Sequence, residues 1–237
     1  MKQKKLSFSV FLFALFYACT NSTPVETGKN GEGSITYKVT YPDSAVITQQ
    51  GVSSAMLPSE TNLFFKGPKA SFVTSAMGVI EIVNLLDNDK KKFTSLLISS
   101  FGESYAFTES PEAVKEQENN PEYEIETTHE KKTIAGLECN KAIVNDLTNK
   151  KKFDIYYYNK IKVYLGNSPY KDFNYLLMDY QDTRFGLPMH VLAQKVDFSP
   201  IDSTMLSVHG DFKWVDKKTF VKLIMGFKNA PPTNTGF

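Results

Sequence analysis

The stretch 133–158, TIAGLECNKAIVNDLTNKKKFDIYYY, predicts a β-hairpin, and the rest of the chain repeats its pattern. An apolar segment ending at Val144 is followed by Asn145-Asp146 and a polar run rich in lysine. Apolar residues then recur at every second position, at Phe153, Ile155 and Tyr157. Period-two alternation on either side of Asn, Asp and Lys is typical of two antiparallel strands joined by a turn.

The same alternation predicts strands along most of the chain. The cleanest, 34–41, has Ile35, Tyr37 and Val39 on one face and polar residues on the other, which favours an antiparallel sheet. The segment 123–134 is so heavily charged that we expect it at a sheet edge. The other predicted strands are 62–66, 70–75, 79–86, 93–99, 104–108, 160–166, 187–198 and 203–215, the last with Val208, Phe212 and Trp214 on one face.

Two helices are predicted. Ser110-Pro111 is a typical start for a short one that runs to Gln117. Ser168-Pro169 begins the second, which Gly186 ends and which carries an apolar stripe at i, i+3, i+4 and i+7. The stripe residues are Phe173, Leu176, Leu177 and Tyr180. The segment 218–227 fits either a final strand or a short helix.

The first nineteen residues indicate export. Met1 to Lys5 contains three lysines, and the uncharged, mostly apolar run 6–18 is too short for a comfortable membrane span. A plain signal peptide or a signal anchor would also account for this pattern. Leu15 to Cys19 resembles the lipobox of bacterial lipoproteins, although Phe16 and Tyr17 are bulkier than usual. This resemblance implies a signal peptide at 1–18, acyl chains such as palmitate on Cys19, and membrane anchoring through them.

Charge argues against nucleic acid as a partner. The chain has 27 basic and 26 acidic residues, and removal of the leader's three lysines leaves 24 against 26. The only arginine is Arg184. A nearly neutral surface with one guanidinium is poorly equipped to bind phosphates or read base edges.

No pattern in the sequence predicts catalysis, a cofactor or a metal site. The three histidines, His129, His190 and His209, are far apart and lack the short spacings of zinc sites. Cys139 lies alone in an apolar strand, where a small buried side chain is the first interpretation and a reactive thiol or an intermolecular disulfide the alternative. The turns DNDKKKF at Asp87 and DLTNKKKF at Asp146 echo each other and lack the closing Glu of a calcium loop, so we interpret both as solvated hairpin turns.

Several short motifs together resemble a family of uncharacterised Bacteroidota lipoproteins. They are Met56-Leu57-Pro58, Phe65-Lys66-Gly67 with Lys69, the run 132–136 leading to 139–142, and Gly186-Leu187-Pro188-Met189. The closing Pro-Gly-aromatic of that family is reduced here to Met225-Gly226-Phe227. The resemblance implies a fold similar to the periplasmic lipoprotein carriers LolA and LolB. That fold is α+β and mainly antiparallel, with a curved sheet or incomplete barrel and two or three short helices across its open side.

These expectations define the predicted organisation and function. We expect a lipidated tether at 19–33, one β-rich domain at 34–228 and a loose tail at 229–237. We expect a non-enzymatic lipoprotein of the outer membrane that faces the periplasm and binds a lipid or acyl chain, with Phe173, Leu176, Leu177 and Tyr180 as candidate lining residues. The alternatives are a module that holds an envelope protein through its sheet face and edges, or an uncharacterised hydrolase.

Overall fold

The computed structural model describes residues 31–42, 57–76, 78–109, 122–163, 169–170, 173–184 and 187–228. The first strands are β1 (Glu32–Thr40), β2 (Glu60–Lys66), β3 (Lys69–Ala76), β4 (Ile80–Asp87), β5 (Lys92–Ser99) and β6 (Tyr105–Glu109). They are followed by β7 (Tyr123–Ile134), β8 (Leu137–Asp146), β9 (Lys151–Lys162), β10 (Tyr175–Arg184) and β11 (Leu187–Asp197). The 3-10 helix η2 (Ser203–Leu206), the short strand β12 (Lys213–Trp214) and the helix α3 (Lys217–Lys228) complete the described elements.

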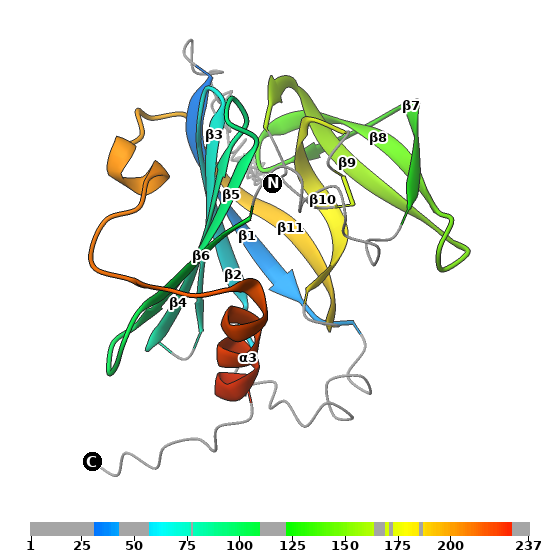
Figure 1. Cartoon of the computed structure of the whole chain (residues 1–237). Helices are drawn as coiled ribbons and strands as arrows, with labels where there is room; N and C mark the ends of the chain where they lie inside the picture. The colour runs from blue at the N-terminus through cyan, green and yellow to red at the C-terminus, as the bar shows by residue number, and fades with distance from the viewer. Residues whose placement is uncertain are drawn as a thin grey trace, which may run out of the picture.

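The described strands form one sheet in the order β12-β6-β5-β4-β3-β2-β1-β11-β10-β9-β8-β7 (Figure 1). β1 lies between two antiparallel meanders. It pairs with β2 of the first meander, which contains β2 to β6, and with β11 of the second meander, which contains β7 to β11. Every pairing is antiparallel except the two-residue contact of β12 with β6. The sheet is curved and stays open, with β12 at one edge and β7 at the other. The predicted antiparallel, curved and incomplete fold is therefore confirmed.

The hairpin predicted at 133–158 is present as β8 and β9, and its turn shares its geometry with the turn between β4 and β5. The Asp146 carboxylate accepts a hydrogen bond from the Asn149 backbone N–H at 2.8 Å, and Lys150 follows in the left-handed region with φ 53°. In the earlier turn the Asp87 carboxylate accepts from the Lys90 N–H, and Lys91 has φ 50°. The interpretation of both segments as hairpin turns stabilised by aspartate is confirmed.

The helix α3 covers part of one face of the first meander. Phe220 and Ile224 are buried against Leu97 and Phe107. The N-terminus of the helix is capped by Asp216, whose carboxylate accepts from the Thr219 N–H at 2.8 Å. This helix resolves the two interpretations left open for 218–227, and it is the only α-helix among the described residues.

The strand predicted at 203–215 is wrong. Asp202 accepts from the Thr204 N–H and starts η2, which contacts β2 and β3, and only Lys213–Trp214 pairs as a strand. The segment leaves Trp214 55% exposed and Val208 partly exposed, while Phe212 packs on apolar side chains of β3 to β6. Phe212 therefore covers the sheet, and only the two residues of β12 extend it.

The helix predicted from Ser168-Pro169 is also wrong, because Tyr175–Arg184 is the strand β10, between β9 and β11. Its register shifts twice, between Tyr175 and Leu176 and between Leu177 and Asp179, so Met178 is an extra residue in the ladder. These irregularities break the period-two pattern and leave apolar residues at helical spacing. The structure does not describe the predicted helix at 110–117, the leader at 1–18 or the tail at 229–237, and of the tether it describes only residues 31–33.

Candidate binding surface

Three of the four predicted ligand-lining residues belong to the core of the sheet. Leu176 is 0% exposed, and Leu177 and Tyr180 are also buried. The Tyr37 hydroxyl donates a hydrogen bond to the Leu177 carbonyl at 2.8 Å, and the Tyr37 and Tyr180 rings meet edge-on at 6.1 Å. These contacts are those of tightly packed side chains that hold β1 against β10. Their part in binding a ligand stays a prediction.

Phe173, the fourth predicted lining residue, is half-buried and belongs to an aromatic group at the start of β10. Its ring lies 4.7 Å from Tyr157 and 5.4 Å from Tyr175, centroid to centroid, and both contacts are edge-on. Tyr157 and Tyr175 stack at 5.2 Å. Of the four predicted residues, only Phe173 retains access to solvent beyond a few percent.

Cys139 is buried, which confirms the structural interpretation of its position. Its thiol donates to the Leu137 carbonyl at 3.4 Å. Burial raises the pKa of the Cys139 thiol to about 11, so the nucleophilic thiolate is scarce at neutral pH.

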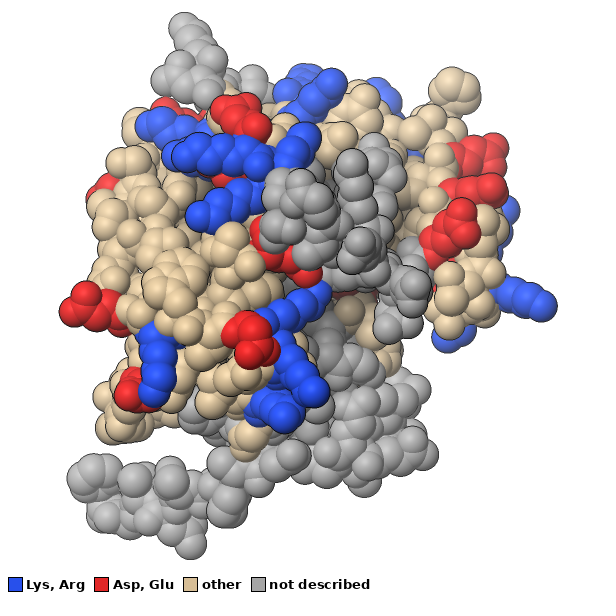
Figure 2. Space-filling view, in the orientation of Figure 1, with Lys and Arg blue, Asp and Glu red and all other residues tan. Residues whose placement is uncertain are grey.

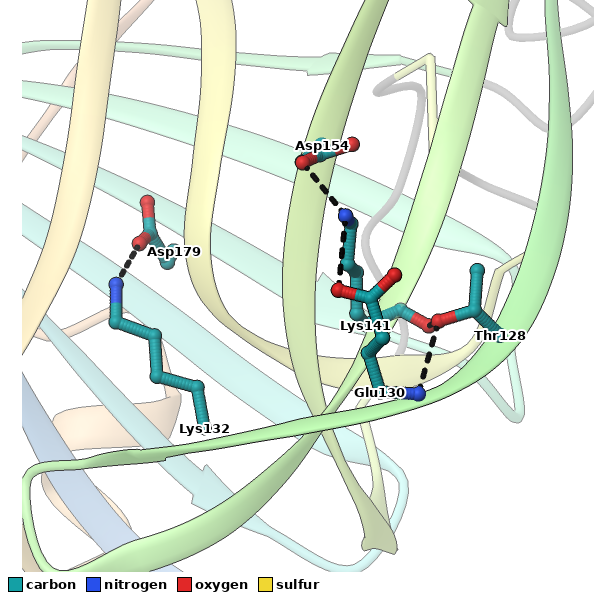
Figure 3. Close-up of polar contacts among 6 residues, drawn as sticks. All are labelled: Thr128, Glu130, Lys132, Lys141, Asp154 and Asp179. Carbon is teal, nitrogen blue, oxygen red and sulfur yellow. Dashed lines mark hydrogen bonds and ion pairs between the residues drawn. The ribbon is translucent and has the colours of Figure 1, made fainter.

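An exposed network of ion pairs lies on the other meander, across β7 to β10 (Figure 3). The Lys141 ammonium binds the Asp154 carboxylate at 2.9 Å and the Glu130 carboxylate at 3.2 Å, and the Lys141 side chain is only 14% exposed. The hydrogen bonds that the Lys141 ammonium donates to Asp154 and Glu130 raise the pKa of Lys141. Lys141 is therefore held in its charged form between two strands.

A second ion pair joins Lys132 of β7 to Asp179 of β10 at 3.3 Å (Figure 3). The Lys132 ammonium also lies 4.9 Å from the centre of the Tyr156 ring, and the other oxygen of Asp179 contacts His190 Nε2 at 2.6 Å. Three strand spacings separate β7 from β10 in a flat sheet, about 14 Å. Lys132 spans them because the tip of the β7–β8 hairpin curls over β9 and β10.

A bulge in β7 produces this curl. Thr127 pairs with Ala142, but the next pairing joins Lys131 to Asn140, so β7 carries two extra residues. The Thr128 hydroxyl donates to the Lys141 carbonyl at 3.2 Å and accepts from the Glu130 N–H at 3.2 Å (Figure 3). These bonds satisfy backbone groups that the interrupted ladder leaves open.

The first part of β7 is regular and lies at the free edge of the sheet. Among the described strands β7 pairs with β8 alone, which confirms the predicted edge position. Tyr123 and Ile125 are half-buried and pack on the core, Ile125 directly opposite Val144. Glu124 and Glu126 are exposed on the other face, and neither forms an ion pair with a described residue.

The acidic side chains of this network are paired with basic groups. Asp154 and Glu130 share the Lys141 ammonium, and Asp179 pairs with Lys132. The described residues contain no group of three or more His, Cys, Asp or Glu side chains that could hold a metal ion. His190 contacts Asp179, whereas His209 contacts the Ser207 hydroxyl. In the part of the chain that the structure describes, no helix is long and apolar enough to cross a bilayer.

Comparisons with known proteins bear on the fold alone. No family model and no curated protein matches the chain. Two solved structures of PNGF-II are similar. The one in space group C2 has a TM-score of 0.51 and 16% identity over 83% of this chain, and the one in P21 has 0.50 and 16% over 81%. The chain spans about a third of the length of PNGF-II, 33% in each case. At 16% identity, the similarity shows a shared fold alone.

Proposed function

We propose that the chain is a lipid-anchored, non-enzymatic protein of the bacterial outer membrane, facing the periplasm. We further propose that the regular part of its β7 edge, residues 123–127, binds a segment of an envelope protein by strand addition. The observation that carries this proposal is the edge itself: a straight stretch with half-buried apolar side chains on one face and exposed carboxylates on the other.

The edge defines the chemistry of the added strand. Five residues span about 17 Å, which suits a peptide strand that pairs through its backbone. The partner's side chains on the core side would extend the packing of Tyr123 and Ile125 and should be apolar. Those on the other side would lie beside Glu124 and Glu126 and should be basic. The expected partner segment therefore alternates apolar and basic residues.

The same carboxylates disfavour pairing with a second copy of this chain. An antiparallel self-pairing centred on Ile125 would place Glu124 opposite Glu126 of the other copy, twice in one short ladder. Like charges directly opposite each other destabilise a strand pair. The edge is thus protected against self-association while it remains open to a basic strand.

Synthetic peptides test this proposal. We expect full-length protein in a non-ionic detergent to bind a capped peptide of alternating valine and lysine, measured by fluorescence anisotropy, and to leave the valine–glutamate peptide free. The Glu124→Lys/Glu126→Lys variant should reverse this preference. The Glu60→Lys/Asp211→Lys variant makes the same charge change at exposed positions outside β7 and should behave as the wild type.

Hydrogen exchange locates the binding. Peptide binding should slow amide exchange within 123–127 and leave the β8–β9 turn unchanged. Equal binding of the valine–lysine peptide by the wild type and the charge-reversed variant would refute the proposal, as would protection confined to other strands. Anchoring is tested separately by metabolic labelling with a palmitate analogue, which should mark the wild type and not Cys19→Ala.

A second candidate, an apolar-ligand carrier, draws support from the half-buried rings of Phe173 and Tyr175, which pack on the buried ring of Tyr157. An acyl chain seated against these rings is the occupant we expect. Native mass spectrometry of the protein purified from a bacterial envelope would then show a bound lipid, which Phe173→Ala should lose. A mass without lipid, and no uptake of added fatty acid, would count against the carrier.

A further inference from the structure

Two lysine-rich turns lie side by side at one end of the first meander. Lys66 and Lys69 flank the β2–β3 turn, and residues 90–92, all lysine, close the β4–β5 turn. The Asn88 N–H donates to the Pro68 carbonyl at 2.9 Å, which fixes the two turns against each other. All five lysines are exposed, and Figure 2 shows basic side chains gathered over the upper part of this view. We call these five residues the lysine end.

The carboxylates near the lysine end neutralise it only in part. Among the described residues of the two turns and the adjoining start of β1, they are Glu32, Asp87 and Asp89, so five lysines against three acids leave a net charge of +2. Glu109, opposite Phe93 at the same end, pairs with Lys217 and leaves this balance unchanged. Glu32 is buried, and it binds Lys66 at 2.8 Å and the Ile201 N–H. Asp87 accepts the Lys90 N–H within its own turn. These two carboxylates therefore serve the fold, and the outward surface is basic.

The chain enters the domain at this same end. The Gly67 N–H in the β2–β3 turn donates to the Gly31 carbonyl at 3.2 Å, and β1 begins at the next residue. Only residues 20–30 separate this point from Cys19. Eleven residues have a root-mean-square length of about 18 Å when they behave as a flexible coil. An anchor on Cys19 would hold the lysine end within that distance of the bilayer.

We propose that the lysine end docks on the anionic phospholipid surface of the membrane that carries the protein, so that the domain has one preferred orientation there. This inference rests on the proposed lipidation of Cys19. Each lysine near an anionic surface contributes about a fivefold gain in affinity. Because an anchored domain is already concentrated at the surface, this modest attraction is sufficient to orient it. The attraction is screened within about 10 Å at 0.1 M salt, so it should weaken as salt is added.

Lysine acylation in vesicles tests the inference with the native protein. The full-length lipoprotein is reconstituted into vesicles of phosphatidylcholine, with or without phosphatidylglycerol, and modified briefly with an N-hydroxysuccinimide ester. Peptide mass spectrometry then gives a rate for each lysine. We expect Lys69, Lys90 and Lys92 to react about fivefold more slowly in the anionic vesicles, with the difference lost in 0.5 M salt.

The β8–β9 turn supplies a matched control, since its three lysines at 150–152 close a turn of the same geometry. They should react equally in both kinds of vesicle. Protein that fails to float with either vesicle would refute the anchoring on which the inference rests. Protein that floats with both, yet shows equal rates at the lysine end, would leave the anchoring intact and overturn the docking. Equal slowing at 150–152 would also overturn it, because it would mean that the domain has no preferred orientation.

Discussion

Met178→Ala distinguishes the strand at 175–184 from the helix that the same residues first predict. In a helix at 100° per residue, Met178 would lie about 150° from the centre of the stripe formed by Phe173, Leu176, Leu177 and Tyr180, and so on the exposed side. In β10 it is the extra residue between two register positions, and its side chain is 0% exposed. The two arrangements therefore give opposite expectations for one substitution.

The expected cost follows from the burial of Met178. Truncation to alanine removes three heavy atoms beyond Cβ, which at about 0.8 kcal/mol each lose about 2.4 kcal/mol of transfer free energy. A partly collapsed cavity adds about 1 kcal/mol. We expect the free energy of unfolding to fall by about 3 kcal/mol, which lowers the Tm of a domain of this size by about 6–12 °C.

Urea unfolding followed by far-UV circular dichroism measures this loss. Met205→Ala is the matched control, because Met205 is 45% exposed in η2 and its truncation should change the free energy of unfolding by less than about 0.5 kcal/mol. The slope of free energy against urea should be the same in both variants. A change below about 0.5 kcal/mol for Met178→Ala would refute the packing argument for β10.

Three further predictions, two substitutions and one labelling experiment, follow from the described contacts. The Ser71 hydroxyl is buried with no hydrogen-bond partner among the described residues, so Ser71→Ala should raise the free energy of unfolding by about 1 kcal/mol in urea titrations. Ala135 and Gly136 form a two-residue hairpin turn with φ 47° and 82°, and Ala135→Asn should raise the Tm, because Asn tolerates this left-handed conformation. With a pKa of about 11, about one Cys139 thiol in a thousand is ionised at pH 8. A thiol reagent should therefore react slowly with the native protein and rapidly in denaturant, and the native rate should rise as the pH approaches 11.

The sequence predicts the regular parts of this fold because each of them repeats a local rule. β1 alternates faithfully, with Ile35, Tyr37 and Val39 buried on one face. The aspartates of the two lysine-rich turns form their hydrogen bonds within four residues, so local sequence contains the whole motif. Charge alone identifies β7 as an edge strand. None of these features depends on a distant partner.

The sequence misleads where the regular period is broken. In β10 the consecutive residues 176–178 are all buried and the register shifts twice, so its apolar residues fall by accident at helical spacing. In the segment 203–215, Phe212 packs on the cluster of Leu96 and Ala106 without being part of a strand, and no local pattern reveals this contact. Three of the four candidate lining residues, Leu176, Leu177 and Tyr180, are core residues because they belong to this strand, whereas Phe173 precedes it and is half-buried.

The β7 edge shows how a local irregularity, which the sequence does not predict, shortens a predicted edge strand to a candidate binding site. Two extra residues after Thr127 swing the end of the hairpin over β9 and β10, where Lys132 reaches Asp179. A full-length straight edge would have offered 12 residues for indiscriminate pairing. The bulge shortens the regular edge to the five residues that end at Thr127, and Glu124 and Glu126 give that remainder a charge. A short, acidic edge is selective for a basic strand in a way that a long neutral edge is not.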